Sequence, residues 1–225
     1  MEIGSPGWLD IIMQGAAQMG LTVTADQARQ FALHGRYLLE WNRRINLTAI
    51  TEPEDVAAKH FLDAIAPLAH LPGRGCLLDI GTGGGFPGLP LKVMMPELSM
   101  TLIDGVRKKV NFVKYVIRQL ELENIQALQA RAEALGRDKS FMGGFQIIVC
   151  RALADLDKLL DLAVPLLAPG GRIIAYQGPQ GNGPSTAEAH SACLTRGERR
   201  FNATAYHYRL PFLGDSRCVT ILESP

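Results

Sequence analysis

The chain has 225 residues, a formal net charge of +1, 47% hydrophobic and 20% charged residues. These values are typical of a soluble globular protein and exclude one that is basic all over, so any nucleic-acid surface must be a local patch. Four distant cysteines without a C-x-x-C pair exclude a zinc ribbon or a disulfide framework, and no apolar run reaches membrane-spanning length. We therefore expect a cytoplasmic protein with neither a membrane nor a metal partner.

The first 70 residues predict helices and no strand. Apolar residues recur at helical spacing over residues 8–19, and Thr24 with Gln27 forms a capping-box pattern before a second, longer helix. A third helix should begin at Pro53, which suits a first helical position. His60 and Asp63 on that helix are interpreted as a satisfied pair. We expect residues 1–70 to form an N-terminal helical extension.

Residues 71–225 alternate between strand and helix patterns, which indicates an α/β fold with a mostly parallel sheet. Helices are expected at 106–122 and 153–168, a mobile loop at 179–184, and a short helix before the last two strands. The last two strands should close the sheet as a hairpin. The seven predicted strands are 76–80, 99–104, 125–130, 145–150, 171–176, 201–209 and 217–223.

The stretch from Cys76 to Gly88 reads as a buried strand, a glycine-rich turn and a helix start. Glycines bring backbone N–H groups close to a ligand, which predicts a nucleotide-like cofactor. The spacing of Gly83, Gly85 and Gly88 also fits a dinucleotide site. Asp79 at the strand end would repel a diphosphate but suits the ammonium and sulfonium groups of S-adenosylmethionine. We therefore favour S-adenosylmethionine over NAD, although Asp79 could instead bind its own loop.

Other polar residues follow the carboxyl ends of the predicted strands, where open sheets of this kind bind ligands. Asp104 could accept the ribose hydroxyls of an adenosine or cap the next helix. Ala132 and Glu133 could meet an adenine edge, or Glu133 could be an ordinary surface residue. Arg151 could hold a carboxylate, a phosphate or a base, or pair with Asp155 one turn later.

Two further features bear on the chemistry. Cys150 precedes Arg151, but without a nearby His we interpret it as an inert buried thiol rather than a nucleophile. Basic residues form three clusters, which indicates a phosphate-rich partner. The clusters are Arg43-Arg44, Arg107-Lys108-Lys109 with Lys114 and Arg118, and Arg196 with Arg199-Arg200.

Taken together and in order, these motifs resemble the RsmG (GidB) family, the small-subunit ribosomal RNA guanine-N7 methyltransferases. The matching pieces run along most of the chain: 41–48, His60-Phe-Leu-Asp63, 78–88, Leu102-Ile-Asp104 with 107–109, Arg131-Ala-Glu133 and Cys150-Arg-Ala152.

The resemblance implies a class I (Rossmann-like) methyltransferase fold, S-adenosylmethionine as methyl donor, and 16S ribosomal RNA, within a whole or partly assembled small subunit, as substrate. It implies that Gly81 and Phe86 bind the cofactor at the glycine loop, Ala132 and Glu133 hold its adenosine, and Arg151 closes the site. With the residues discussed above, the expected cofactor-binding set is Asp79, Gly81, Gly83, Phe86, Asp104, Ala132, Glu133 and Arg151.

Two positions depart from the family pattern. Cys150 stands where a Ser is common, and Gln177 stands where a Lys is usual, which removes a cation that could face the RNA. A small-molecule methyltransferase, an NAD-dependent oxidoreductase and a non-catalytic nucleotide-binding module remain open as alternatives from the residues alone.

Overall fold

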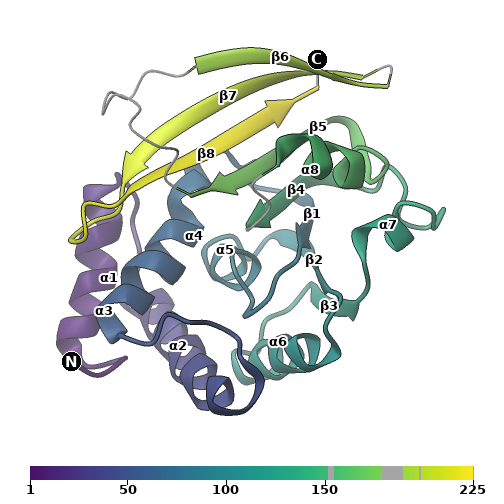
Figure 1. The fold of residues 1–225 in the computed structure, drawn as a ribbon. Coiled ribbons are helices and arrows are strands. Elements are labelled where there is room, and N and C mark those ends of the chain that lie inside the picture. Colours follow the sequence, from purple (N-terminus) through teal and green to yellow (C-terminus); the bar gives the residue numbers. More distant parts are fainter. Residues whose placement is uncertain (152–154, 179–189, 198, 225) are drawn as a thin grey trace.

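The structure is a computed structural model that describes residues 1–151, 155–178, 190–197 and 199–224. Its centre is one eight-stranded sheet around which the helices are arranged (Figure 1). The strands are β1 (Gly75–Ile80), β2 (Leu98–Asp104), β3 (Ile125–Gln129), β4 (Phe145–Arg151), β5 (Leu167–Gln177), β6 (His190–Arg196), β7 (Arg199–Arg209) and β8 (Ser216–Glu223). Their order across the sheet is β3-β2-β1-β4-β5-β8-β7-β6.

The sheet has a parallel part and an antiparallel part. The pairs β1–β2, β2–β3, β1–β4 and β4–β5 are parallel. The pairs β5–β8, β7–β8 and β6–β7 are antiparallel. The α/β class predicted from the sequence is confirmed, and the sheet is mixed with eight strands rather than mostly parallel with seven.

The additional strand is β6, in a region where a short helix was expected. That expectation is wrong for residues 190–196, because they pair in register with the free edge of β7. Gly197, at a positive φ of 55°, lies in the tight turn between the two strands. The expected helix at 153–168 is also shorter in the described part, since α8 spans Leu156–Ala163. The expected loop at 179–184 lies outside the described residues.

The N-terminal helical unit consists of α1 (Pro6–Gln18), α2 (Ala25–Ile45) and a third helical segment from Pro53 to His70. The predicted capping box of α2 is present, with Thr24 and Gln27 bonded reciprocally. The third segment is not uniform: α3 (Pro53–Asp55) continues into the π-helix η1 (Val56–Leu62), α4 (Asp63–Ile65) and the 3-10 helix η2 (Ala66–His70). A π-helix inside such a segment often marks a functional site.

Helices cover both faces of the sheet. The apolar residues of α1, α2, η1, α5 (Gly88–Met94) and α6 (Arg107–Gln119) form one cluster with one face. Those of α7 (Ala132–Leu135) and α8 pack on the other face. Trp8, Phe31 and Phe61 are at most 1% exposed and belong to the same cluster as Leu77 of β1. The N-terminal helical unit therefore shares its core with the sheet.

Candidate functional site

Four of the predicted site residues lie on or next to the carboxyl ends of the central strands. Asp79 is the penultimate residue of β1, Asp104 is the last residue of β2, and Arg151 is the last residue of β4. Because β1, β2 and β4 are parallel neighbours, these ends meet at one edge of the sheet. Gly81 directly follows β1 at this same edge.

Asp79 is fully buried, which opposes its ionisation. One carboxylate oxygen, Oδ2, accepts a hydrogen bond from the Gly88 N–H at the start of α5 at 2.9 Å. The other, Oδ1, is buried without a hydrogen-bond partner among the described residues. Burial raises the pKa of Asp79 to about 7, although the Gly88 N–H and the charge of Arg151 act in the opposite direction. The Thr82 hydroxyl lies near enough to lower this pKa, but its geometry falls short of a hydrogen bond.

The glycine loop presents backbone rather than side chains. Gly81 and Gly83 have φ angles of +75° and +56°, which L-residues with a side chain rarely adopt. A Cβ on Gly81 would meet no atom within 4 Å, so the backbone there borders open space. A Cβ on Gly88 would instead lie 2.7 Å from Asp79 Oδ2. Glycine at position 88 thus lets α5 begin directly against the buried carboxylate.

Asp104 is held by backbone on both oxygens. Its Oδ2 accepts from the Gly83 N–H at 3.0 Å, and its Oδ1 accepts from the Val106 N–H at 2.7 Å. The residue is 9% exposed. Asp104 therefore joins the glycine loop to Val106, the residue before α6. The helix-capping role considered from the sequence is wrong, because Val106 stands at the N-cap of α6 and no side chain caps this helix.

Ala132 and Glu133 open the short helix α7 after β3. Ala132 is 4% exposed, whereas Glu133 is exposed and extends from the same edge. The preceding Arg131 lies beside Gly105, since a Cβ on Gly105 would be 3.7 Å from Arg131 Cγ. The loops after β2 and β3 are therefore adjacent.

Arg151 is bound by the N-terminal helical unit and not by Asp155. Its Nη2 lies 3.2 Å from Asp63 Oδ2 and also donates to the Lys59 carbonyl. Its Nη1 is buried and has no hydrogen-bond partner among the described residues. Asp155 caps α8 and pairs with Lys158, so the ion pair considered from the sequence is replaced by a long-range one.

Phe86 is buried, unlike Gly81 and Gly83 of the same loop. Its ring is 7% exposed and stacks between the imidazoles of His34 and His60, at centroid distances of 4.6 and 4.5 Å. His34 Nε2 donates to the Gly84 carbonyl at 2.8 Å. Burial lowers the pKa of His34 to about 4, and burial with the nearby Arg151 charge lowers that of His60 to about 3. Both imidazoles are therefore neutral near pH 7, and the stack fixes the loop to the helical unit.

Sequence reasoning missed the partners of Arg151. His60 bonds to the Thr48 hydroxyl at 2.8 Å, so the expected pair of His60 with Asp63 is wrong. Asp63 instead accepts from the Tyr208 hydroxyl at 2.7 Å. No local signal links these positions, because they are 145 residues apart in the chain.

The two positions that depart from the family pattern are both buried. Cys150 is 2% exposed inside the sheet. Gln177 is 8% exposed, and its Oε1 accepts from the Thr220 hydroxyl at 2.7 Å. Neither side chain is a surface group at this edge.

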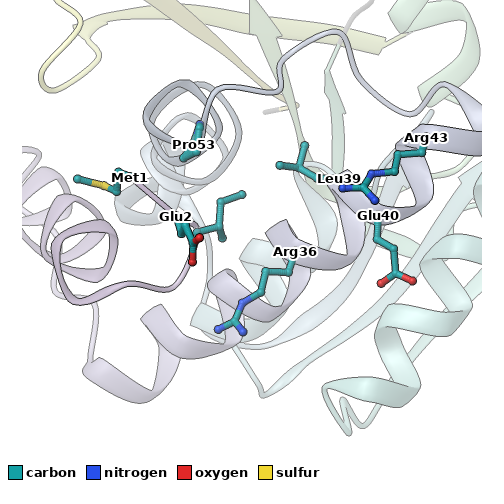
Figure 2. Close-up of a pocket in the computed structure, with 8 residues that line it drawn as sticks. Met1, Glu2, Arg36, Leu39, Glu40, Arg43 and Pro53 are labelled. Atoms are coloured by element: carbon teal, nitrogen blue, oxygen red, sulfur yellow. The ribbon is translucent and has the colours of Figure 1, made fainter.

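A pocket of about 370 Å³ lies away from the strand ends, between the first residues and α2 (Figure 2). It contains none of the predicted site residues. Its lining residues are Met1, Glu2, Ile3, Arg36, Leu39, Glu40, Arg43 and Pro53. Among the described residues, no group of three or more His, Cys, Asp or Glu side chains could hold a metal ion. In that same part of the chain, no helix has the length and apolar character needed to cross a bilayer.

The donor set at the strand ends fits a cofactor with an amino-acid part and a nucleoside part. Asp79 Oδ1 and Arg151 Nη1 are buried polar atoms without a partner among the described residues, one an acceptor and one a donor. Such a pair suits an ammonium and a carboxylate. The open space at Gly81 gives a ligand access to the loop backbone. Buried polar atoms in native structures are usually paired, so these two atoms fit a ligand.

Comparisons with known proteins show what the chain is similar to. The family model described as GidB, rRNA small subunit methyltransferase G, matches residues 27–208. A Ribosomal RNA small subunit methyltransferase G of Streptococcus pyogenes serotype M49 is 40% identical over 209 residues, covering 91% of this chain and 86% of the relative. The serotype M1 protein of the same name is similar to the same extent.

Solved structures show the same fold at low sequence identity. A SAM-dependent methyltransferase of Aquifex aeolicus has a TM-score of 0.50 at 14% identity, covering 76% of this chain and 93% of its own. A transferase of Pyrococcus horikoshii has a TM-score of 0.52 at 13% identity, covering 72% of this chain and 62% of its own. At these identities the likeness concerns the fold alone.

Proposed function

The chain belongs to the GidB family of rRNA small subunit methyltransferase G proteins, and from this premise we propose that it methylates N7 of one guanine in 16S ribosomal RNA. The enzyme is an S-adenosylmethionine-dependent methyltransferase acting on small-subunit rRNA. We place it in the cytoplasm, with the small ribosomal particle as substrate. The observation that carries the proposal is the family match over residues 27–208, which includes the glycine loop and Arg151.

The residues proposed to hold S-adenosylmethionine lie at the carboxyl ends of the strands. Asp79 would receive the ammonium of the methionine part, and Arg151 would face its carboxylate. The backbone at Gly81 and Gly83 would border the ligand, and Asp104, Ala132 and Glu133 would lie along its adenosine. Phe86 would act by fixing the loop. When bound, S-adenosylmethionine supplies a methyl group on a positively charged sulfur.

The proposed acceptor atom explains why the site needs no general base. Guanine N7 has a lone pair and carries no proton, so no proton must be removed before the methyl group is transferred. The work of this chain is then to align the acceptor and to exclude water. A methyltransferase acting on an exocyclic amine typically has an Asp/Asn-Pro-Pro motif after the fourth strand, whereas this sequence reads Cys150-Arg-Ala-Leu.

Guanine N7 also limits the form of the substrate. In A-form RNA this atom faces the deep, narrow major groove that side chains cannot enter. The target base must therefore lie in a single-stranded segment or be flipped out of its stack. Exposed Arg107, Lys108, Lys114 and Arg118 on α6 supply cations for the flanking phosphates.

The buried Asp79 argues against a dinucleotide cofactor. A diphosphate at the glycine loop would place two negative groups beside a carboxylate that has no free space to turn away. S-adenosylmethionine carries no phosphate, and its methionine part brings positive charge to this position. The spacing of the loop glycines favours the NAD-dependent alternative, but the buried carboxylate of Asp79 opposes it.

The proposal is tested by transfer of a labelled methyl group. The protein is incubated with methyl-labelled S-adenosylmethionine and, separately, with small subunits, large subunits and free small-subunit rRNA from cells that lack this activity. We expect label in the RNA of the small subunit and none in the large subunit. Label confined to small molecules, or no label in any RNA, would contradict the proposal.

A further inference from the structure

We propose that Asp63 of the N-terminal helical unit is a positioning residue for methyl transfer, because it holds the Arg151 guanidinium in place at the end of β4. The inference rests on the proposed function, in which Arg151 faces the cofactor. According to this inference, the N-terminal helical unit contributes to the methyl-transfer site as well as to the hydrophobic core.

In the described part of the chain, the Arg151 guanidinium is anchored through its Nη2. Nη2 lies 3.2 Å from Asp63 Oδ2 and also donates to the carbonyl of Lys59. Lys59 belongs to the π-helix η1, and Asp63 is the first residue after it. Nη1 remains buried and without a hydrogen-bond partner among the described residues. A planar guanidinium fixed through one nitrogen has a defined direction for the other.

Asp63 is itself held from the far end of the chain. The residue is 4% exposed, and its Oδ1 accepts from the Tyr208 hydroxyl of β7 at 2.7 Å. Arg217 of β8 places its Nε 3.7 Å from the same oxygen. Side chains from β4, β7 and β8, all far from Asp63 in the sequence, therefore converge on its buried carboxylate. Because buried ion pairs contribute little net stability, a role in geometry is the better explanation for keeping this one.

Arg151 ends β4 beside the end of β1, where the residues proposed to hold the cofactor lie. Cys150, the preceding residue, pairs with Ile80 at the end of β1, next to Asp79. Burial is the main cause of the pKa shifts of Asp79 and His60, and the positive charge of Arg151 lowers the pKa of both. If Asp63 were neutral, the guanidinium would lose its ionic anchor and could turn. Misplacement by about 1 Å can cost about 100-fold in rate.

A double-mutant cycle tests the proposal. The variants are Asp63→Asn, Arg151→Met and the two combined, and the readouts are kcat/KM for methyl transfer to small subunits, KM for S-adenosylmethionine, and Tm. Asp55→Asn is the matched control, because Asp55 pairs with the Lys59 side chain one turn earlier and lies outside the site. We expect unchanged kcat/KM in the control.

If Asp63 acts through Arg151, Asp63→Asn lowers kcat/KM by about 100-fold in the parent and by less than about threefold in the Arg151→Met background. Equal losses in both backgrounds would overturn the inference, because Asp63 would then act independently of Arg151. A loss that tracks Tm alone would also overturn it. A parent protein that transfers no methyl group to small subunits would contradict the proposed function instead.

Tyr208→Phe carries the same test if Asp63→Asn does not fold. It keeps every charge and removes one hydrogen bond to Asp63. We expect a several-fold loss of kcat/KM in the parent background and none after Arg151→Met. No loss in either background, or the same loss in both, would overturn the inference.

Discussion

Asp79 is fully buried, and the proposed function gives its negative charge a role in holding the ammonium of the cofactor. Its pKa is raised from 3.8 to about 7 by burial, so the folded protein binds this proton more tightly than the unfolded chain does. The stability linked to that proton is fully present below about pH 4 and is lost as pH rises through about 7. Near pH 8 the ionised carboxylate therefore destabilises the ligand-free protein.

Asp79→Asn should raise stability at pH 8 and abolish cofactor binding. The shift of about three pKa units corresponds to at most about 4 kcal/mol, since one unit is about 1.4 kcal/mol. Thermal unfolding should give a higher Tm for the variant at pH 8 and no gain at pH 4. Calorimetry should show no S-adenosylmethionine binding by the variant, and tighter binding by the parent as pH rises through 7. Retained binding, or the same Tm shift at both pH values, would contradict this interpretation.

The sequence located the residues at the strand ends and missed what holds them. Asp79, Asp104 and Arg151 could be placed because each follows an apolar run, and parallel strands bring such ends together. The contact of Asp63 with Tyr208 could not be predicted, because the two residues are 145 positions apart and no local pattern links them. Burial of Phe86 between two imidazoles likewise depends on packing between distant segments.

Among the elements, the glycine loop contains two kinds of glycine. Gly81 and Gly85 both have positive φ, so a side chain at either costs about 1–2 kcal/mol in backbone strain. A Cβ at Gly81 faces open space, whereas one at Gly85 would lie 2.4 Å from Leu89 Cδ1, in a fully buried residue. A side chain at position 81 would therefore occupy space open to a ligand, whereas one at position 85 would disturb the packing of the core.

Gly85→Ala should lower Tm clearly more than Gly81→Ala. Gly81→Ala should still fold and lose S-adenosylmethionine affinity, because its methyl group enters the space beside the loop backbone. Thermal unfolding and calorimetry on both variants measure the two effects. The reverse order of Tm, or normal cofactor affinity of Gly81→Ala, would show that the loop does not border the ligand.

Helix α6 begins with Arg107, Lys108 and Lys109, against the preference for acidic residues at a helix N-terminus. Replacing Arg107 and Lys108 together by Gln should leave Tm equal or higher, since an unfavourable interaction with the helix dipole is removed. Binding to the small subunit should weaken, and its logarithmic salt dependence should decrease by about two, about one for each phosphate contact.

Arg74→Gln is the control for these substitutions. Arg74 is exposed just before β1, at the opposite edge of the sheet from the first residues of α6. Its replacement should leave the salt dependence of binding unchanged. If the α6 variant also keeps the parent slope, its cations are merely solvated and contact no phosphate.

Element prediction succeeded where the pattern was local and failed where a neighbour decided the structure. The capping box defined the start of α2, and the apolar runs defined the central strands. Strand β6 depends on the open edge of β7, and the π-helix η1 depends on contacts of the helical unit with the sheet. The strand or helix propensity of residues within either segment does not depend on these tertiary contacts, so it could not predict them.

For the whole molecule, we propose that the helical extension (1–70) and the methyltransferase domain (71–225) unfold together. The two parts are separate stretches of the sequence, but they are not separate in space. Trp8, Phe31 and Phe61 of the extension share one buried cluster with β1 and the glycine loop. Thermal unfolding should show one transition with equal calorimetric and van't Hoff enthalpies. Two separated transitions would show that the helical unit is an independent domain.

Transfer of a methyl group to guanine N7 at one position of the small-subunit RNA can be detected by chemical cleavage of that RNA. Methylated N7 leaves a fixed positive charge on the ring, so borohydride followed by aniline cleaves the RNA chain there. After incubation of small subunits with the protein and S-adenosylmethionine, we expect cleavage at a single guanine in a single-stranded segment. Labelled methyl on a cytosine carbon, an adenine amine or a ribose hydroxyl, with no cleavage, would contradict the account.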